Sequence, residues 1–135
     1  MTPAQLAKSG TEHGHQRAIF CWAQQNTHKY PALDLLFAIP NGGKRDKITA
    51  GKLKAEGVKA GVPDICLAVS TSHSAALYIE LKRPKDKGKA KTKGVVGNKQ
   101  AEWSAKLIKY GNAVCVAYGW EHAVDILESY LSSDI

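Results

Sequence analysis

The chain has no apolar run near the roughly 20 residues that a membrane-spanning helix needs. Its first segment, MTPAQLAKSGTEHGHQ, also lacks the apolar stretch of a secretory signal. Only three cysteines are present, Cys21, Cys66 and Cys115, and they stand far apart without a C-x-x-C pair or zinc-ligand spacing. Three reduced and mostly buried thiols fit this pattern best. We therefore expect a cytoplasmic protein with no membrane span and no zinc site.

Acidic residues are also scarce, because 12 Asp and Glu face 19 Lys and Arg, which gives a net charge of +7. The positive charge is concentrated in two segments: residues 82–93 hold seven basic residues and one acid, and residues 44–59 hold six basic residues and two acids. By contrast, residues 120–135 hold four acids and neither Lys nor Arg. A single basic run is often only a solvated loop, but two runs around one candidate site favour a polyanionic partner.

The length of 135 residues predicts a single domain over residues 1–135. Apolar periodicity and turn residues predict an α/β fold with a mixed central sheet flanked by helices. The expected order is helix, three strands, helix, strand, helix, with a short extra helix before the second strand. The expected helices are 11–28 (capped by Thr11), 46–56, 99–110 and 120–131, and the expected strands are 33–39, 64–70, 76–82 and 113–118.

The segment 63–82, PDICLAVSTSHSAALYIELK, has the apolar residues of a buried β-hairpin but carries charges at its two rims. Side chains alternate faces along a strand, so Glu80 and Lys82 share one face. A turn in the polar middle of the segment brings Asp64 beside Glu80 or Leu81, within one cross-strand spacing of about 5 Å. The hairpin therefore predicts that two carboxylates and a lysine meet at one place.

Two carboxylates at that distance repel each other, and a hard divalent cation such as Mg²⁺ removes the conflict. A neighbouring lysine can orient or deprotonate an attacking water and stabilise charge on a phosphoryl group. An isolated E-x-K is usually a surface ion-pair cluster. The predicted hairpin and the flanking basic runs instead favour a site for phosphodiester cleavage.

Five blocks of the sequence together resemble the virus-type replication-repair nuclease (VRR-NUC) domain of the PD-(D/E)xK nuclease superfamily. They occur in the family's order over about residues 12–120. The similarity is particularly to the short stand-alone members of phages and bacteria. The blocks are E-x-x-x-Q at 12–16, I-P-N-G at 39–42, K-A-G-V-P-D-I at 59–65, I-E-L-K-R-P at 79–84, and Gln100 with Trp103.

The resemblance implies a restriction-endonuclease-like core and a DNA endonuclease that depends on Mg²⁺ or Mn²⁺. It implies metal ligation by Glu12, Asp64, Glu80 and the carbonyl of Leu81. Lys82 would be the catalytic lysine, and Gln16 and Gln100 would support the scissile phosphate. The expected DNA contacts are Asn41, Lys44, Arg45, Arg83, Lys85, Lys87 and Lys89, the last three acting on phosphates.

The resemblance further implies branched DNA, such as four-way (Holliday) junctions, as substrate in replication, recombination or repair within a bacterial host cell. A junction resolver cuts two strands symmetrically, so a small domain with one site is expected to act as a two-fold homodimer. Three alternatives stay open. Glu12 could merely favour the helix start, the Pro40–Gly43 turn could be only a turn, and the domain could be a non-catalytic DNA-binding module or an RNA-processing nuclease.

Overall fold

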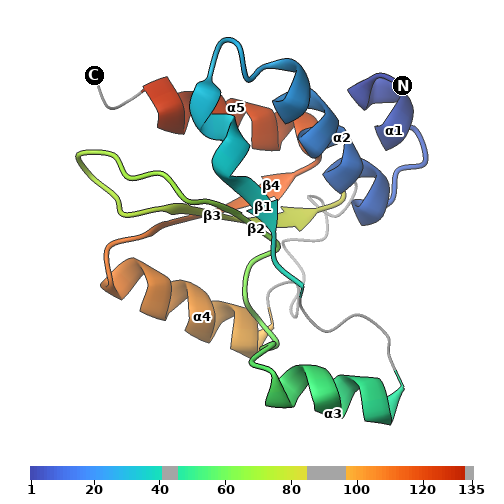
Figure 1. The fold of residues 1–135 in the computed structure, drawn as a ribbon, viewed down its shortest axis with the longest axis vertical. Helices are drawn as coiled ribbons and strands as arrows, with labels where there is room; N and C mark the ends of the chain where they lie inside the picture. The colour runs from blue at the N-terminus through green and yellow to red at the C-terminus, as the bar shows by residue number, and fades with distance from the viewer. Residues whose placement is uncertain (41–45, 85–96, 133–135) are drawn as a thin grey trace.

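The computed structural model describes residues 1–40, 46–84 and 97–132 and shows a four-stranded sheet with helices on both faces (Figure 1). The strands lie in the order β1-β2-β3-β4. The pairs β1–β2 and β2–β3 are antiparallel, whereas β3–β4 is parallel, so the predicted mixed α/β sheet is confirmed. The strands are β1 (Leu36–Ala38), β2 (Ile65–Leu67), β3 (Leu77–Lys82) and β4 (Ala113–Tyr118).

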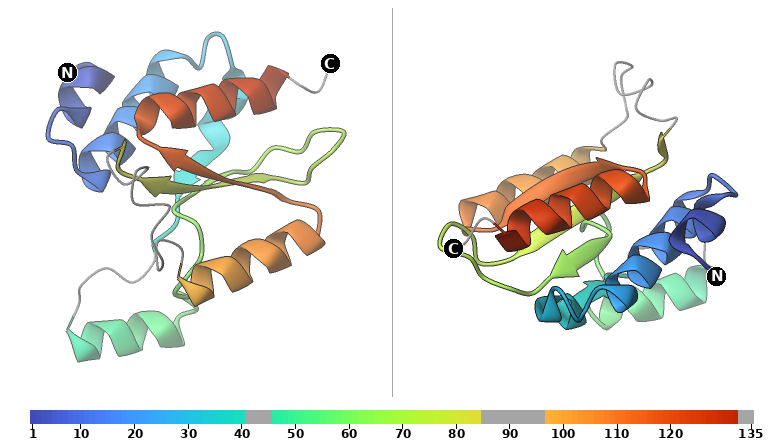
Figure 2. Two further views of the ribbon diagram at one scale, coloured as in Figure 1. Left: turned by 180° about the vertical axis from the view of Figure 1, so that it is seen from behind. Right: turned by 90° about the horizontal axis from the view of Figure 1, so that it is seen from above.

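The helices form two layers around this sheet. Helices α2 and α5 cover one face, α4 lies on the other, and α3 stands beyond α4 on that second side (Figures 1 and 2). The short α1 packs on α2 and is an element that the sequence pattern did not predict. The helices are α1 (Pro3–Ala7), α2 (Glu12–Gln25), α3 (Lys47–Ala55), α4 (Asn98–Lys109) and α5 (Trp120–Ser132), with a 3₁₀ helix η1 (Pro31–Leu35).

The hydrophobic core lies between the sheet and the α2–α5 layer. From β3, Leu77, Ile79 and Leu81 are each at most 1% exposed and belong to one cluster with Ile19 of α2 and Leu127 of α5. Because alternate strand residues point to opposite faces, the other residues of β3 face the α4 side. That alternation decides on which side of the sheet Glu80 and Lys82 lie.

The prediction of a strand over residues 33–39 is wrong. Residues 31–35 form η1, and only residues 36–38 form β1. Pro31 stands at the start of η1, where its fixed φ suits a helical turn, and Leu33 buries its side chain there to 3% exposure. A short apolar run satisfies burial equally well in a helical turn or a strand, so its periodicity could not separate the two.

The predicted helix starts are confirmed to within one residue. Thr11 caps α2, because its hydroxyl accepts a hydrogen bond of 2.9 Å from the Gly14 amide. In α5, Leu127 and Tyr130 face the core and are buried. In contrast, Tyr110 is 75% exposed, because it is the C-cap residue at which the chain leaves α4.

Within residues 1–40, 46–84 and 97–132, none of the helices combines the length and the apolar content required to cross a membrane.

Gly61 fixes the approach of the chain to Asp64 and is expected to tolerate no side chain. Its φ is +89°, and a Cβ there would meet the backbone carbonyl of Lys99, at the start of α4, at 2.8 Å. Gly61→Ala is therefore expected to lower the free energy of unfolding by about 1–2 kcal/mol. Urea denaturation measures this change.

Gly51→Ala in α3 is the matched control, because nothing lies within 4 Å of a Cβ at that position. Alanine in a helix interior is favoured over glycine, so this variant is expected to gain about 0.5–1 kcal/mol at most. Equal stabilities of the two variants would contradict a close contact between Gly61 and α4.

Candidate active site

The hairpin of β2 and β3 brings Asp64 against Glu80. Ile65 pairs with Ile79, so the preceding Asp64 stands opposite Glu80. The amide of Leu81 donates a hydrogen bond of 2.7 Å to Oδ2 of Asp64, and the Glu80 carboxyl also hydrogen-bonds to the Asp64 side chain. The juxtaposition that the sequence predicted is therefore present, and a backbone donor orients one of its two carboxylates.

Glu80 is a carboxyl group in a site that disfavours its charge. It is only 7% exposed. The pKa of Glu80 is raised to about 9, first by burial and then by the hydrogen bond and the charge of Asp64. The charge of Glu12 raises this pKa further, whereas the charge of Lys82 lowers it. At neutral pH the pair therefore holds a proton between two carboxylates. A divalent cation would replace that proton and favour both ionised groups.

Lys82 ends β3 on the same face as Glu80, and its side chain is half-buried. Two backbone contacts fix its position. It pairs with Tyr118 of the parallel strand β4, and its carbonyl accepts a hydrogen bond of 2.9 Å from the Gly119 amide. Lys82 therefore extends from a fixed strand on the same face as Glu80, as the alternation of side chains along the strand predicted.

Helix α2 brings two further predicted residues to this end of the molecule. Glu12 is its first residue and is exposed, and its charge acts on Glu80. Gln16 follows one turn later, is half-buried, and lines a pocket of about 200 Å³ with Phe20 and with Ala38 of β1. Because Glu12 and Gln16 are four residues apart in α2, they lie on one helical face, and Glu12 is close enough for its charge to act on Glu80.

The oxygen donors of Asp64 and Glu80 are the type that hard cations such as Mg²⁺ or Mn²⁺ prefer. In the part of the chain that the structure describes, no group of three or more His, Cys, Asp or Glu residues is gathered closely enough to hold a metal ion. The residues present fit a two-carboxylate site that substrate and water complete. Metal ligation by Glu12 and by the carbonyl of Leu81 stays a prediction.

The remaining predicted residues fall into two groups. Gln100 stands in the first turn of α4, where its Oε1 accepts a hydrogen bond of 3.4 Å from the Gly97 amide. Arg83 follows β3 directly and is half-buried. The predicted DNA contacts that lie outside the described residues are Asn41, Lys44, Arg45, Lys85, Lys87 and Lys89.

His15 is a positioning residue that the sequence analysis missed. It is 7% exposed, and its Nδ1 accepts a hydrogen bond of 3.0 Å from the Trp120 amide at the start of α5. Burial lowers its pKa, although the charge of Glu121 opposes this shift. The neutral His15 side chain thus connects α2 to α5 by a hydrogen bond, at a point of α2 between Glu12 and Gln16. Its partner is 105 residues away in the chain, so no local pattern could reveal the contact.

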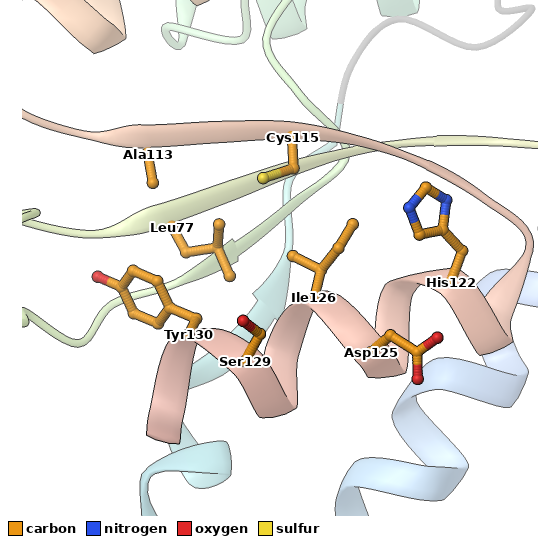
Figure 3. Close-up of a pocket in the computed structure, with 8 residues that line it drawn as sticks. All are labelled: Leu77, Ala113, Cys115, His122, Asp125, Ile126, Ser129 and Tyr130. Atoms are coloured by element: carbon orange, nitrogen blue, oxygen red, sulfur yellow. The ribbon is translucent and has the colours of Figure 1, made fainter. Parts of the chain in front are cut away.

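A larger groove of about 410 Å³ lies elsewhere, between α5 and the sheet (Figure 3). It is lined by Leu77 and Cys115 from the strands and by Asp125 and Tyr130 from α5, among others. Leu77 points to the α5 face, whereas Glu80 points to the opposite one. The sheet therefore separates this groove from the carboxylate pair.

The mixed sheet, with two carboxylates and a lysine at the end of its antiparallel hairpin, is the arrangement expected of a nuclease-type domain. Comparison with known families gives the particular group. The sequence profile of the VRR-NUC domain matches residues 5–121, and the chain belongs to this family. The resemblance carried by the five sequence blocks is thereby confirmed.

A solved structure described as a "VRR_NUC domain protein" is similar to this chain. It is 26% identical in sequence, the superposition has a TM-score of 0.68, and the match covers 89% of this chain and 87% of that one. The similarity supports the same nuclease fold over most of the chain. None of the curated proteins compared with this chain matches it.

Proposed function

We propose that this protein is an endonuclease that hydrolyses phosphodiester bonds in DNA and depends on Mg²⁺ or Mn²⁺. The observation that carries the proposal is the pair of Asp64 and Glu80, which share a proton at neutral pH beside Lys82. Two carboxylates held this close suit a divalent cation, whose charge favours both ionised groups. The positive net charge of +7 suits a polyanionic substrate.

Each residue of the site has a distinct role in this proposal. Asp64 and Glu80 hold the cation, which supplies Lewis-acid stabilisation of the charge that builds on the phosphoryl oxygens. Lys82 orients the attacking water and stabilises the same charge from the side of β3. Gln16 and Gln100 would position the phosphate by hydrogen bonds from their amides. Glu12 and the Leu81 carbonyl would join substrate and water as further ligands of the cation.

The substrate that we propose is branched DNA, including four-way junctions, met during replication, recombination or repair in a bacterial host. Family membership supports DNA as the target, and the acid pair supplies one catalytic centre per chain. Symmetric cutting of two strands then requires two copies related by a two-fold axis. We therefore propose that the active form is a homodimer.

A cleavage panel tests this function. Linear duplex, single-stranded, flap and four-way junction DNA, together with duplex RNA, are incubated with Mg²⁺, with Mn²⁺ and with EDTA. The expected result is cleavage of branched DNA with either metal, 5′-phosphate ends at the mapped cuts, and no cleavage in EDTA.

Two outcomes of the panel would favour the rival functions. Binding without cutting of any nucleic acid would indicate a non-catalytic DNA-binding module. Preferred cutting of duplex RNA would indicate an RNA-processing nuclease. Sedimentation of the protein with an uncleavable junction measures the number of chains per junction, and a single chain per junction would contradict the homodimer.

A further inference from the structure

Helix α3 has local caps at both of its ends. None of its nine residues is buried, and it stands away from the sheet and from α4 (Figures 1 and 2). At its start, the Asp46 carboxylate accepts a hydrogen bond of 2.8 Å from the Thr49 amide. At its end, the Val58 amide donates to the Leu53 carbonyl at 2.9 Å. So short a helix is marginal in water without a partner.

The exposed side chains of α3 form a face that carries three lysines. At 100° per residue, Lys47 and Lys54 lie along one edge of this face and Lys52 along the other. Gly51, Ala55 and Ile48, which is 73% exposed, lie between them, and nothing stands within 4 Å of a Cβ placed on Gly51. The two small residues lie next to the edge of Lys47 and Lys54, where they let a phosphate backbone approach the helix closely. We call these six residues the α3 face.

The two acids near α3 lie at its ends and not within the α3 face. Asp46 is occupied as the N-cap, where hydrogen bonds to Thr49 hold its pKa below the usual value. Glu56 is the C-cap residue and follows the last helical position. In the described ranges, the three lysines form no ion pair with an acid, and all are exposed. The α3 face therefore presents three exposed lysines to solvent, with the ionised Asp46 at one end of the helix and Glu56 at the other.

Charge also divides between the two sides of the sheet. On the side of Glu80 and Lys82, α4 carries Lys99, Lys106 and Lys109 against the single acid Glu102. On the opposite side, α5 carries acids and neither Lys nor Arg in its 13 residues, whereas α2 carries both Glu12 and Arg17. A polyanion is therefore attracted more to α4 than to α5, and α4 covers the face of β3 that carries Glu80 and Lys82.

We propose that the α3 face binds the phosphate backbone of the duplex that flanks the cleaved bond. This inference rests on the proposed DNA endonuclease function and assigns the flanking duplex a contact outside the active site. Asp64 follows Glu56 by eight positions, so the end of α3 lies within about 29 Å of Asp64 even for an extended chain. Helix α3 is about 14 Å long, so at about 3.4 Å per base pair the whole contact lies within about thirteen base pairs of the cut.

The contact between Gly61 and Lys99 fixes the segment that joins α3 to Asp64 against the start of α4. Gly61 lies between α3 and Asp64, and its Cα approaches the backbone of Lys99 so closely that a Cβ would not fit. Duplex held on α3 is thereby held in a defined position relative to Asp64 and to the start of α4, where Gln100 stands. The α3 face would then set how much duplex the enzyme requires beside the scissile phosphate.

The test compares two variants that each lose two positive charges. Lys47→Gln with Lys54→Gln removes one edge of the α3 face, whereas Lys8→Gln with Lys29→Gln removes exposed charges on the α1–α2 side. Binding to a junction is measured against salt concentration in the Asp64→Asn background, which prevents cleavage. The slope of log K against log salt is expected to fall by about 1.8 for the α3 variant and to change little for the control.

The length of the duplex arms of the junction provides a second, independent test. Each duplex arm of the junction is shortened in turn to about four base pairs. Shortening the arm that contacts α3 is expected to abolish the difference in junction affinity between wild type and the α3 variant. An unchanged salt slope, a slope change equal to the control's, or a loss that is independent of every arm's length would overturn the inference. Dissociation of a DNA-free dimer by the α3 substitutions would also overturn it, because a second copy would then cover the α3 face.

These outcomes are separate from those of the proposed function. A wild-type protein that cuts junctions but shows no effect of the α3 substitutions retains the function and loses the inference. A protein that never cuts, but whose binding depends on the α3 face and on arm length, loses the enzymatic function and retains the binding surface.

Discussion

Replacing Asp64 by Asn is expected to lower the rate of DNA cleavage at least about 1,000-fold, because the charge that holds the cation is lost. Stabilisation of the transition state by a bound metal contributes several kcal/mol, and each 1.36 kcal/mol is a factor of ten in rate. Asn is nearly isosteric with Asp, and its amide oxygen can still accept the hydrogen bond that the Leu81 amide donates at 2.7 Å. The fold and the DNA affinity are therefore expected to remain.

Single-turnover cleavage of a junction measures this loss, and equilibrium binding of the same junction measures the retained affinity. Asp125→Asn is the matched control, because Asp125 lies in the groove on the far side of the sheet (Figure 3) and is expected to leave the rate within a few-fold. Lys82→Met should likewise slow cleavage strongly without preventing binding. Wild-type rates in Asp64→Asn would place the reaction somewhere other than this hairpin.

The metal-free protein is expected to lose stability as the pH rises from about 5 to about 9. Folding raises the pKa of Glu80 from its ordinary 4.5 to about 9. The folded state therefore binds more protons than the unfolded state across this range, and the free energy of unfolding falls with pH. The stability contributed by protonated Glu80 is complete below about 4.5 and is lost as the pH passes through about 9. We expect a decline of more than about 2 kcal/mol.

A divalent cation should reverse this trend, because it binds the ionised pair and displaces the proton. Stabilisation by Mg²⁺ or Mn²⁺ is thus expected to grow with pH. Glu80→Gln should flatten the metal-free profile and abolish most of the metal effect. The measurement is urea denaturation at several pH values, with EDTA and with each metal.

The difference between wild type and Glu80→Gln isolates the contribution of Glu80 from that of His15. Burial lowers the pKa of His15 from its usual 6.5, so its contribution to stability is lost as the pH falls, which is the opposite direction. A wild-type profile parallel to that of Glu80→Gln between pH 5 and 9 would show that Glu80 ionises normally. The proton shared with Asp64 would then not exist.

Much of the candidate site could be predicted because its geometry is local. Residues 63–82 form one hairpin, and the alternation of side chains along β3 places Glu80 and Lys82 on one face. The pairing of Ile65 with Ile79 then follows from a turn in the middle of the segment. The same locality explains why the helix cap at Thr11 was predictable, whereas the apolar run before β1 was not, since burial alone does not choose between a helical turn and a strand.

The sequence by itself determined the hairpin, the order of the main helices and strands, and the residue types of the site, because these depend on turns, caps and periodicities that act within a few residues. Only the tertiary structure decided that Glu80 is buried and shares a proton with Asp64, that His15 ties α2 to α5, and that α3 stands apart on the basic side of the sheet. Each of these depends on which surfaces pack together across the chain. The desolvation and long-range contacts that result are not encoded in any single segment.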